Sequence, residues 1–133
     1  MDKLEPYFAP LGRVLLAVIF IFAGVSKIAS GGAGMVEYME SVGVPGFLFW
    51  PAAIFEVVAG LMVLVGYKTK LVGFLLAGFC IITGALFHYV PADQTQMTMM
   101  MKNFAMAGGF LMLARFGAGE FSMDNRASNP SVD

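Results

Sequence analysis

Charged residues, cysteine and histidine are scarce in this sequence. Only 13% of its 133 residues are charged, with one cysteine (Cys80) and one histidine (His88). A single cysteine excludes an internal disulfide and a Cys-x-x-Cys redox pair, and a single histidine excludes the bis-histidine ligation of a membrane cytochrome. No basic patch, phosphate-binding loop or catalytic-triad spacing occurs, so nucleic acid is not an expected partner. The chain is not expected to catalyse a redox reaction by itself.

Apolar residues, in contrast, are abundant. They make up 59% of the chain, and the mean hydropathy is +0.79. Soluble domains average about 45–50% apolar residues, so a lipid bilayer is the predicted solvent. Four apolar stretches, each about 18–21 residues long, are of the length that an α-helix needs to cross a bilayer; they cover residues 10–29, 47–66, 70–90 and 99–116. The alternation typical of barrel strands is absent, so the predicted fold is all-α.

These stretches predict one integral membrane domain over residues 1–133, an antiparallel bundle of four transmembrane helices. A cleaved signal peptide does not fit residues 10–29, because Arg13 and Lys27 lie inside the apolar run. Six basic residues fall on the side of the termini and two on the other, which predicts cytoplasmic termini. The six are Lys3, Arg13, Lys68, Lys70, Arg115 and Arg126, and the two are Lys27 and Lys102.

Two connecting regions carry further predictions. The first outer loop, residues 30–46, contains the amphipathic segment MVEYMESV, which favours a short interfacial helix from Gly34 to Val42. The tail, residues 117–133, is polar and poor in apolar residues. We therefore expect the tail to be disordered.

Glu56 is the most unusual residue, because the run around it, residues 47–66, is otherwise apolar or small. A charged group at the centre of a membrane helix costs about 2.5–3.5 kcal/mol on insertion scales, so it usually faces the bundle interior. Side chains lean toward the N-terminus of their helix. In antiparallel neighbours, Glu56 and Lys27 therefore lean toward each other, and an ion pair is predicted.

The other two spans each add an ionisable group to the same outer half, His88 near the end of the third and Lys102 near the start of the fourth. Arg13 is expected to anchor the cytoplasmic side. Two interpretations stay open: a Glu56–Lys27 clamp that only pairs helices, or a cavity for a proton, an anion or a quinone head group. A quinone site predicts a pocket bordered by Glu56 and by aromatic residues such as Phe22 and Phe55.

No metal site is predicted. Thioethers suit Cu(I), and several methionines cluster near His88, at positions 97 and 99–101. Methionine is, however, ordinary packing material in apolar helices. Any cofactor would therefore be a bound quinone and not an intrinsic metal group.

Two segments resemble the DoxX family. RVLLAVIFIFAGVSKI, from Arg13 to Ile28, looks like its first helix, with the arrangement Arg…Ala-Gly-x-x-Lys. EVVAGLMVLVGYKTKLVGFLLA, from Glu56 to Ala77, resembles its second motif, a glutamate on a helix followed by glycine and a basic turn. The resemblance implies a bacterial inner-membrane protein with four spans, and Arg13, Lys27 and Glu56 as its motif positions. Some relatives are membrane partners of oxidoreductases, including a thiosulfate:quinone oxidoreductase subunit.

Three classes of function follow as hypotheses. The leading one is a membrane partner or quinone-site subunit of a soluble or membrane oxidoreductase. The second is a small proton-coupled transporter that uses Glu56 and Lys27. The third is a structural or assembly scaffold without a small ligand. The sequence leaves homo-oligomerisation open.

Overall fold

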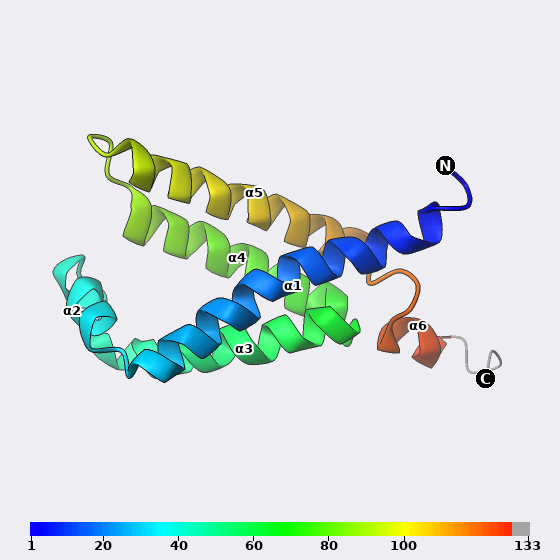
Figure 1. Ribbon diagram of the computed structural model, residues 1–133, viewed down its shortest axis with the longest axis horizontal. Helices are drawn as coiled ribbons and strands as arrows, with labels where there is room; N and C mark the ends of the chain where they lie inside the picture. The colour runs from blue at the N-terminus through cyan, green and yellow to red at the C-terminus, as the bar shows by residue number, and fades with distance from the viewer. Residues whose placement is uncertain (129–133) are drawn as a thin grey trace.

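The computed structural model describes residues 1–128, and all regular structure in this part of the chain is helical (Figure 1). The elements are α1 (Glu5–Ser30), α2 (Ala33–Ser41), the 3-10 turn η1 (Gly46–Leu48), α3 (Phe49–Val65), α4 (Thr69–His88), α5 (Gln94–Phe116) and α6 (Met123–Ser128). The prediction of an all-helical chain is confirmed for the described residues.

The long helices form two antiparallel pairs. α1 packs along α3, and α4 packs along α5, whereas contacts between the two pairs are much sparser. Figure 1 shows the pairs lying close together near the α3–α4 turn and diverging toward α2. We call the divergent end, which holds α2 and the α4–α5 turn, the cavity end. The opposite end, which holds the α3–α4 turn and α6, is the tail end.

Glycines bring the paired helices close together. A Cβ atom on Gly24 of α1 would lie 3.0 Å from the carbonyl oxygen of Ala53 on α3. A Cβ atom on Gly73 of α4 would lie 3.0 Å from the carbonyl oxygen of Phe110 on α5. Small residues allow such backbone contact between membrane helices, whose association in lipid is not driven by the hydrophobic effect.

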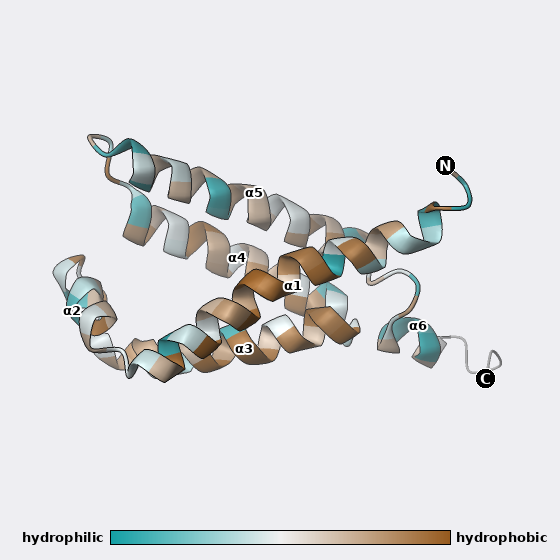
Figure 2. Cartoon of the chain, in the orientation of Figure 1, coloured by the Kyte–Doolittle hydropathy of each residue, from teal (hydrophilic) through white to brown (hydrophobic). Residues whose placement is uncertain are grey.

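Three helical segments are long and apolar enough to cross a membrane: Glu5–Ser30, Gly46–Val65 and Thr69–His88. Their outward faces carry large apolar side chains, and Figure 2 shows that much of α1 and α3 is apolar. α5 is not among the three, because its first turns are polar. It begins at Gln94, five residues before the expected start, where the side chain of Asp93 accepts hydrogen bonds from the backbone N–H groups of Thr95 and Gln96.

The apolar core fills the middle of the bundle and the side toward the tail end. Ala17, Phe20, Val63, Leu76 and Phe110 are among its buried members. Phe20 packs edge-on against Phe110, with ring centroids 5.3 Å apart. The core thus joins both helix pairs and leaves only the cavity end splayed.

The tail differs from its predicted disorder as far as the structure describes it. Residues 117–128 fold back over the α3–α4 turn and include α6. Arg13 donates to the carbonyl oxygens of Phe121 at 2.9 Å and Glu120 at 3.3 Å, and Tyr7 stacks on Phe121 with centroids 5.7 Å apart. The polar composition gave no sign of this docking, because Arg13 binds backbone carbonyls, which are present in every residue. Residues 129–133 lie outside the described part of the chain.

Candidate functional site

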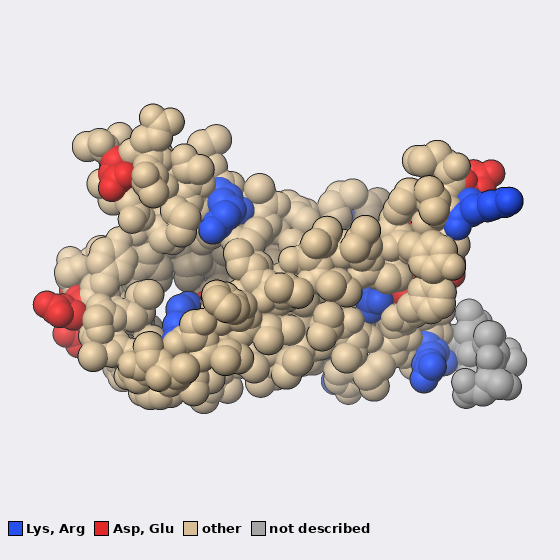
Figure 3. Space-filling model, viewed as in Figure 1, with Lys and Arg blue, Asp and Glu red and all other residues tan. Residues whose placement is uncertain are grey.

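A cavity of about 500 Å³ lies between the two helix pairs at the cavity end. Figure 3 shows the hollow on the left of the molecule, with basic side chains at its edges. Its lining is mostly apolar, with five aromatic residues, namely Phe20, Tyr38, Phe49, Phe79 and Phe87. α2 contributes to the lining and is tied to α4, because the Tyr38 hydroxyl donates to the carbonyl of Phe87.

One wall carries the ion pair of Lys27 and Glu56. Lys27 Nζ lies 2.6 Å from Glu56 Oε1, and the side chains are 28% and 5% exposed. The close approach of Gly24 to Ala53 explains the contact. Because the helices are antiparallel, the three-residue steps from Gly24 to Lys27 and from Ala53 to Glu56 run in opposite directions, and the gap is closed by the tilt of each side chain toward the N-terminus of its helix and by the length of the lysine side chain. The second carboxylate oxygen, Oε2, has no hydrogen-bond partner among residues 1–128.

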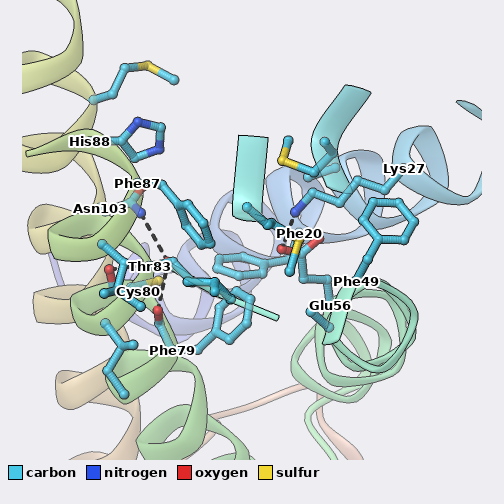
Figure 4. A pocket seen from close by; sticks show the side chains of 18 of the residues that line it. Phe20, Lys27, Phe49, Glu56, Phe79, Cys80, Thr83, Phe87, His88 and Asn103 are labelled. Carbon is cyan, nitrogen blue, oxygen red and sulfur yellow. Dashed lines mark hydrogen bonds and ion pairs between the residues drawn. The ribbon is translucent and has the colours of Figure 1, made fainter. Parts of the chain in front are cut away.

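The opposite wall carries polar groups from α4 and α5 (Figure 4). Asn103 Nδ2 donates to Thr83 Oγ1 at 3.3 Å, and the Thr83 hydroxyl donates to the carbonyl of Phe79 at 2.7 Å. His88 Nδ1 lies 2.8 Å from Gln96 Oε1. Figure 4 shows aromatic rings, including those of Phe20 and Phe79, between the two walls.

Four of the five predicted site residues line this cavity: Glu56, Lys27, His88 and Lys102. Lys102 is exposed, and its Nζ lies 3.7 Å from Met99 Sδ. Arg13 is not part of the site. It is 14 residues before Lys27 on α1, about 21 Å away at 1.5 Å per residue, and it is buried at the tail end.

The prediction that Phe22 and Phe55 border the pocket is wrong. Phe22 points outward and is 72% exposed, and Phe55 packs against Phe79, with centroids 5.3 Å apart, without lining the cavity. Phe20 and Phe79 take their place. The sequence of α1 held a signal for this, because Phe20 lies seven residues after Arg13 and seven before Lys27 and so shares their helix face, whereas Phe22 does not.

The sequence analysis also missed Asn103 and Thr83. The available signal was a carboxamide in the run MMMKNFAMAGG, where a polar group inside an apolar helix calls for a partner. Within residues 1–128, no group of three or more His, Cys, Asp or Glu side chains could hold a metal ion. The arrangement instead offers ammonium and amide donors, and carboxylate and amide acceptors, around an apolar space.

Apolar helices of membrane length, packed around a cavity with a buried ion pair, define a small helical membrane protein. The chain belongs to the DoxX family, whose family model matches residues 8–89. It is 41% identical to "Inner membrane protein YqjF" of Escherichia coli (strain K12), over 93% of this chain and 95% of that protein. It is 30% identical to "Inner membrane protein YphA" of the same strain, over 92% and 91%.

A more limited match covers half of the chain. Over 65 residues, 49% of this chain and 48% of the other, it is 35% identical to "Putative oxidoreductase CatD" of Bacillus subtilis (strain 168). No solved structure matches the chain.

Proposed function

We propose that this DoxX-family membrane protein binds a quinone head group in the cavity and serves as the membrane partner of a redox system, without catalysis of its own. The observation that carries the proposal is the Lys27–Glu56 ion pair in the wall of an apolar cavity of about 500 Å³. Small-molecule sites typically measure about 300–1,000 Å³ and combine apolar walls with a few placed polar groups.

The chemistry of the two walls fits a quinone. Aromatic side chains offer faces for stacking with a flat ring. The Lys27 ammonium has three N–H donors, of which one is used by Glu56, so a quinone carbonyl can accept another. Glu56 holds the ammonium in place and offsets its charge. The splayed helix pairs leave space through which an isoprenoid tail can pass toward the lipid.

The names of the relatives support a location in the inner membrane and a link to redox chemistry. Two of them are named as inner membrane proteins, which supports the same location here. The relative named as an oxidoreductase supports a redox link, although it matches only half of the chain. The partner would be a soluble or membrane oxidoreductase that supplies or accepts the electrons.

The proposal includes a four-span topology. α5 has 23 residues, about 34 Å at 1.5 Å per residue, which is enough to cross the hydrocarbon. Together with the three apolar segments, it would place both termini on the cytoplasmic side by the distribution of basic residues. α2 would then lie at the outer surface of the membrane, above the cavity.

Quinone binding is tested with the full chain in lipid nanodiscs and a short-chain 1,4-benzoquinone, by equilibrium dialysis against empty nanodiscs. The wild type should bind the quinone saturably. Lys27→Met should weaken binding at least tenfold, because it removes a charged donor. Lys70→Met is the matched control, since Lys70 is exposed and lies outside the cavity. No saturable binding by the wild type, or equal losses in both variants, would refute the proposal.

The proton-coupled carrier is the weaker alternative. It needs a polar path to both membrane faces, whereas the polar cavity groups all lie at one end. Toward the tail end, the bundle interior is filled by apolar core residues such as Ala17, Val63 and Leu76. A ligand site that opens toward one side fits this arrangement better than a path through the bundle.

A further inference from the structure

We propose that Asn103 is the second hydrogen-bonding group of the quinone site, so that the ligand is a ring with two oxygens at opposite positions, held between Lys27 and Asn103. The inference rests on the proposed quinone function and deepens it. It names a residue on α5 that sets specificity, and it distinguishes a para-quinone from an amphiphile with one polar head.

The position of Asn103 is fixed by packing. Its side chain is half-buried and lines the cavity from α5. A Cβ atom on Gly84 of α4 would lie 2.9 Å from Asn103 Cβ, so the two helices touch at this point. The amide is thus held against the wall at a defined depth, and does not extend from the rim as exposed Lys102 does.

The hydrogen-bond chain also fixes which way the amide faces. The Thr83 hydroxyl has one proton, which it donates to the carbonyl of Phe79. Thr83 Oγ1 must therefore accept from Asn103, and this assigns Nδ2 to the bond with Thr83. Among residues 1–128, Asn103 Oδ1 has no bond partner, and it is not one of the fully enclosed polar atoms. It is left as a free acceptor, next to the second N–H of Nδ2.

The two groups belong to different helix pairs. Lys27 and Asn103 lie on opposite walls, with aromatic rings between them (Figure 4). A ring with oxygens at both ends can bond to both walls: one oxygen accepts from Lys27, and the other accepts from Nδ2 or, when reduced, donates to Oδ1. A fatty acid or phospholipid would satisfy one wall and leave Oδ1 and the second N–H of Asn103 without a bond to the ligand.

The test compares a short-chain 1,4-benzoquinone with a phenol that has the same alkyl chain and one oxygen. Both are measured by equilibrium dialysis with the full chain in nanodiscs. Asn103→Leu should weaken quinone binding about three- to tenfold, the usual range for one neutral hydrogen bond, and change phenol binding less than twofold. Thr83→Val, which removes only the group that orients the amide, should give a smaller loss in the same direction. Thr98→Val is the control, because Thr98 is exposed on the same helix and outside the cavity.

The outcomes separate the two proposals. If the wild type binds no quinone, the proposed function itself fails. If quinone binding depends on Lys27 but is unchanged in Asn103→Leu, the quinone function stands and this inference is overturned. Equal losses for quinone and phenol in Asn103→Leu would also overturn it, because they would show a general distortion of the cavity.

Discussion

The two ends of the bundle each bury a charged side chain, yet only one end has space beside it. At the tail end, Arg13 is 2% exposed and donates to two backbone carbonyls of the tail. At the cavity end, Glu56 is 4% exposed and pairs with Lys27. Both leave polar atoms without partners among residues 1–128: Nε and Nη1 of Arg13, and Oε2 of Glu56.

The difference lies in what surrounds each charge. Arg13 is enclosed by the tail and by the α3–α4 turn, where Gly66 leaves room for its guanidinium. Glu56 faces a cavity of about 500 Å³ lined by both helix pairs. A buried charge in a membrane helix is therefore not sufficient evidence of a ligand site. Arg13 is enclosed at the tail end, whereas Glu56 borders an open cavity at the cavity end. The predictions below test this difference.

The largest effect is expected from Lys27→Met. This change leaves the Glu56 carboxylate buried without its cation, and breaking a buried pair in this way costs about 3–5 kcal/mol in unfolding free energy. The double variant Lys27→Met/Glu56→Leu should recover most of that loss, because both charges are gone, yet should still bind quinone poorly. Unfolding in mixed detergent–SDS micelles measures the stability of both variants.

These two variants also distinguish an ion pair that only holds the helices together from one that binds a ligand. If the double variant is as stable as the wild type and retains quinone binding, the ion pair is not needed for the ligand. If Lys27→Met is as stable as the wild type, the carboxylate is not held by Lys27 in the way that the structure shows.

The pairing of Lys27 with Glu56 was predictable from sequence, because helix direction and side-chain tilt follow from the order of the spans. Other features required tertiary information. The inward position of Phe20 is not one of them, since Arg13, Phe20 and Lys27 recur every seven residues on one face of α1 and Phe22 lies off that face. The docking of residues 117–128 combines Arg13 bonds to backbone carbonyls with Asp124 bonds to backbone N–H groups of Lys68 and Thr69, and backbone partners cannot be identified from residue types. The role of Asn103 depends on its contacts with Thr83 and Gly84 of α4, which are set by how α4 and α5 pack.

The second effect is expected at the tail end, from Gly66→Ala. Gly66 has φ +70°, and a Cβ there would lie 2.0 Å from Arg13 Nη1 and 2.4 Å from Ser122 Cβ. Backbone strain and overpacking together should cost about 2–4 kcal/mol. Quinone binding should change less than twofold, because the cavity is at the other end. A stability loss accompanied by an equal loss of binding would contradict the independence of the two ends.

A third, smaller effect concerns the helix caps. Asp124 of the tail accepts from the backbone N–H groups of Lys68 at 2.8 Å and Thr69 at 2.9 Å, at the start of α4. Burial would raise the pKa of this carboxyl, but these N–H donors and the Arg13 charge outweigh it, so the pKa lies below the ordinary value of 3.8. Asp124→Ala should cost about 1 kcal/mol at pH 7.

The sign of the pH dependence follows from the lowered pKa. The stabilisation by Asp124 is fully present above pH 3.8 and is lost as the pH falls through the lower pKa of the folded state. The difference in unfolding free energy between the wild type and Asp124→Ala should therefore shrink below that pH. Asp93→Ala, at the N-terminus of α5, is the matched cap at the cavity end. A constant difference from pH 7 to pH 3 would show that the ionised carboxylate is not the stabilising species.

The smallest effect is expected from Gly12→Ala, next to Arg13 on α1. A Cβ atom there meets nothing within 4 Å, and the backbone is helical. Alanine should stabilise the helix by about 0.5 kcal/mol or leave it unchanged, since glycine inside a helix is unfavourable. Paired with Gly66→Ala in the same unfolding assay, it isolates the cause of the loss at Gly66. If both variants lose stability to the same extent, the loss at Gly66 does not come from its contact with Arg13. The tail end would then not be stabilised by the enclosure of Arg13, as proposed above.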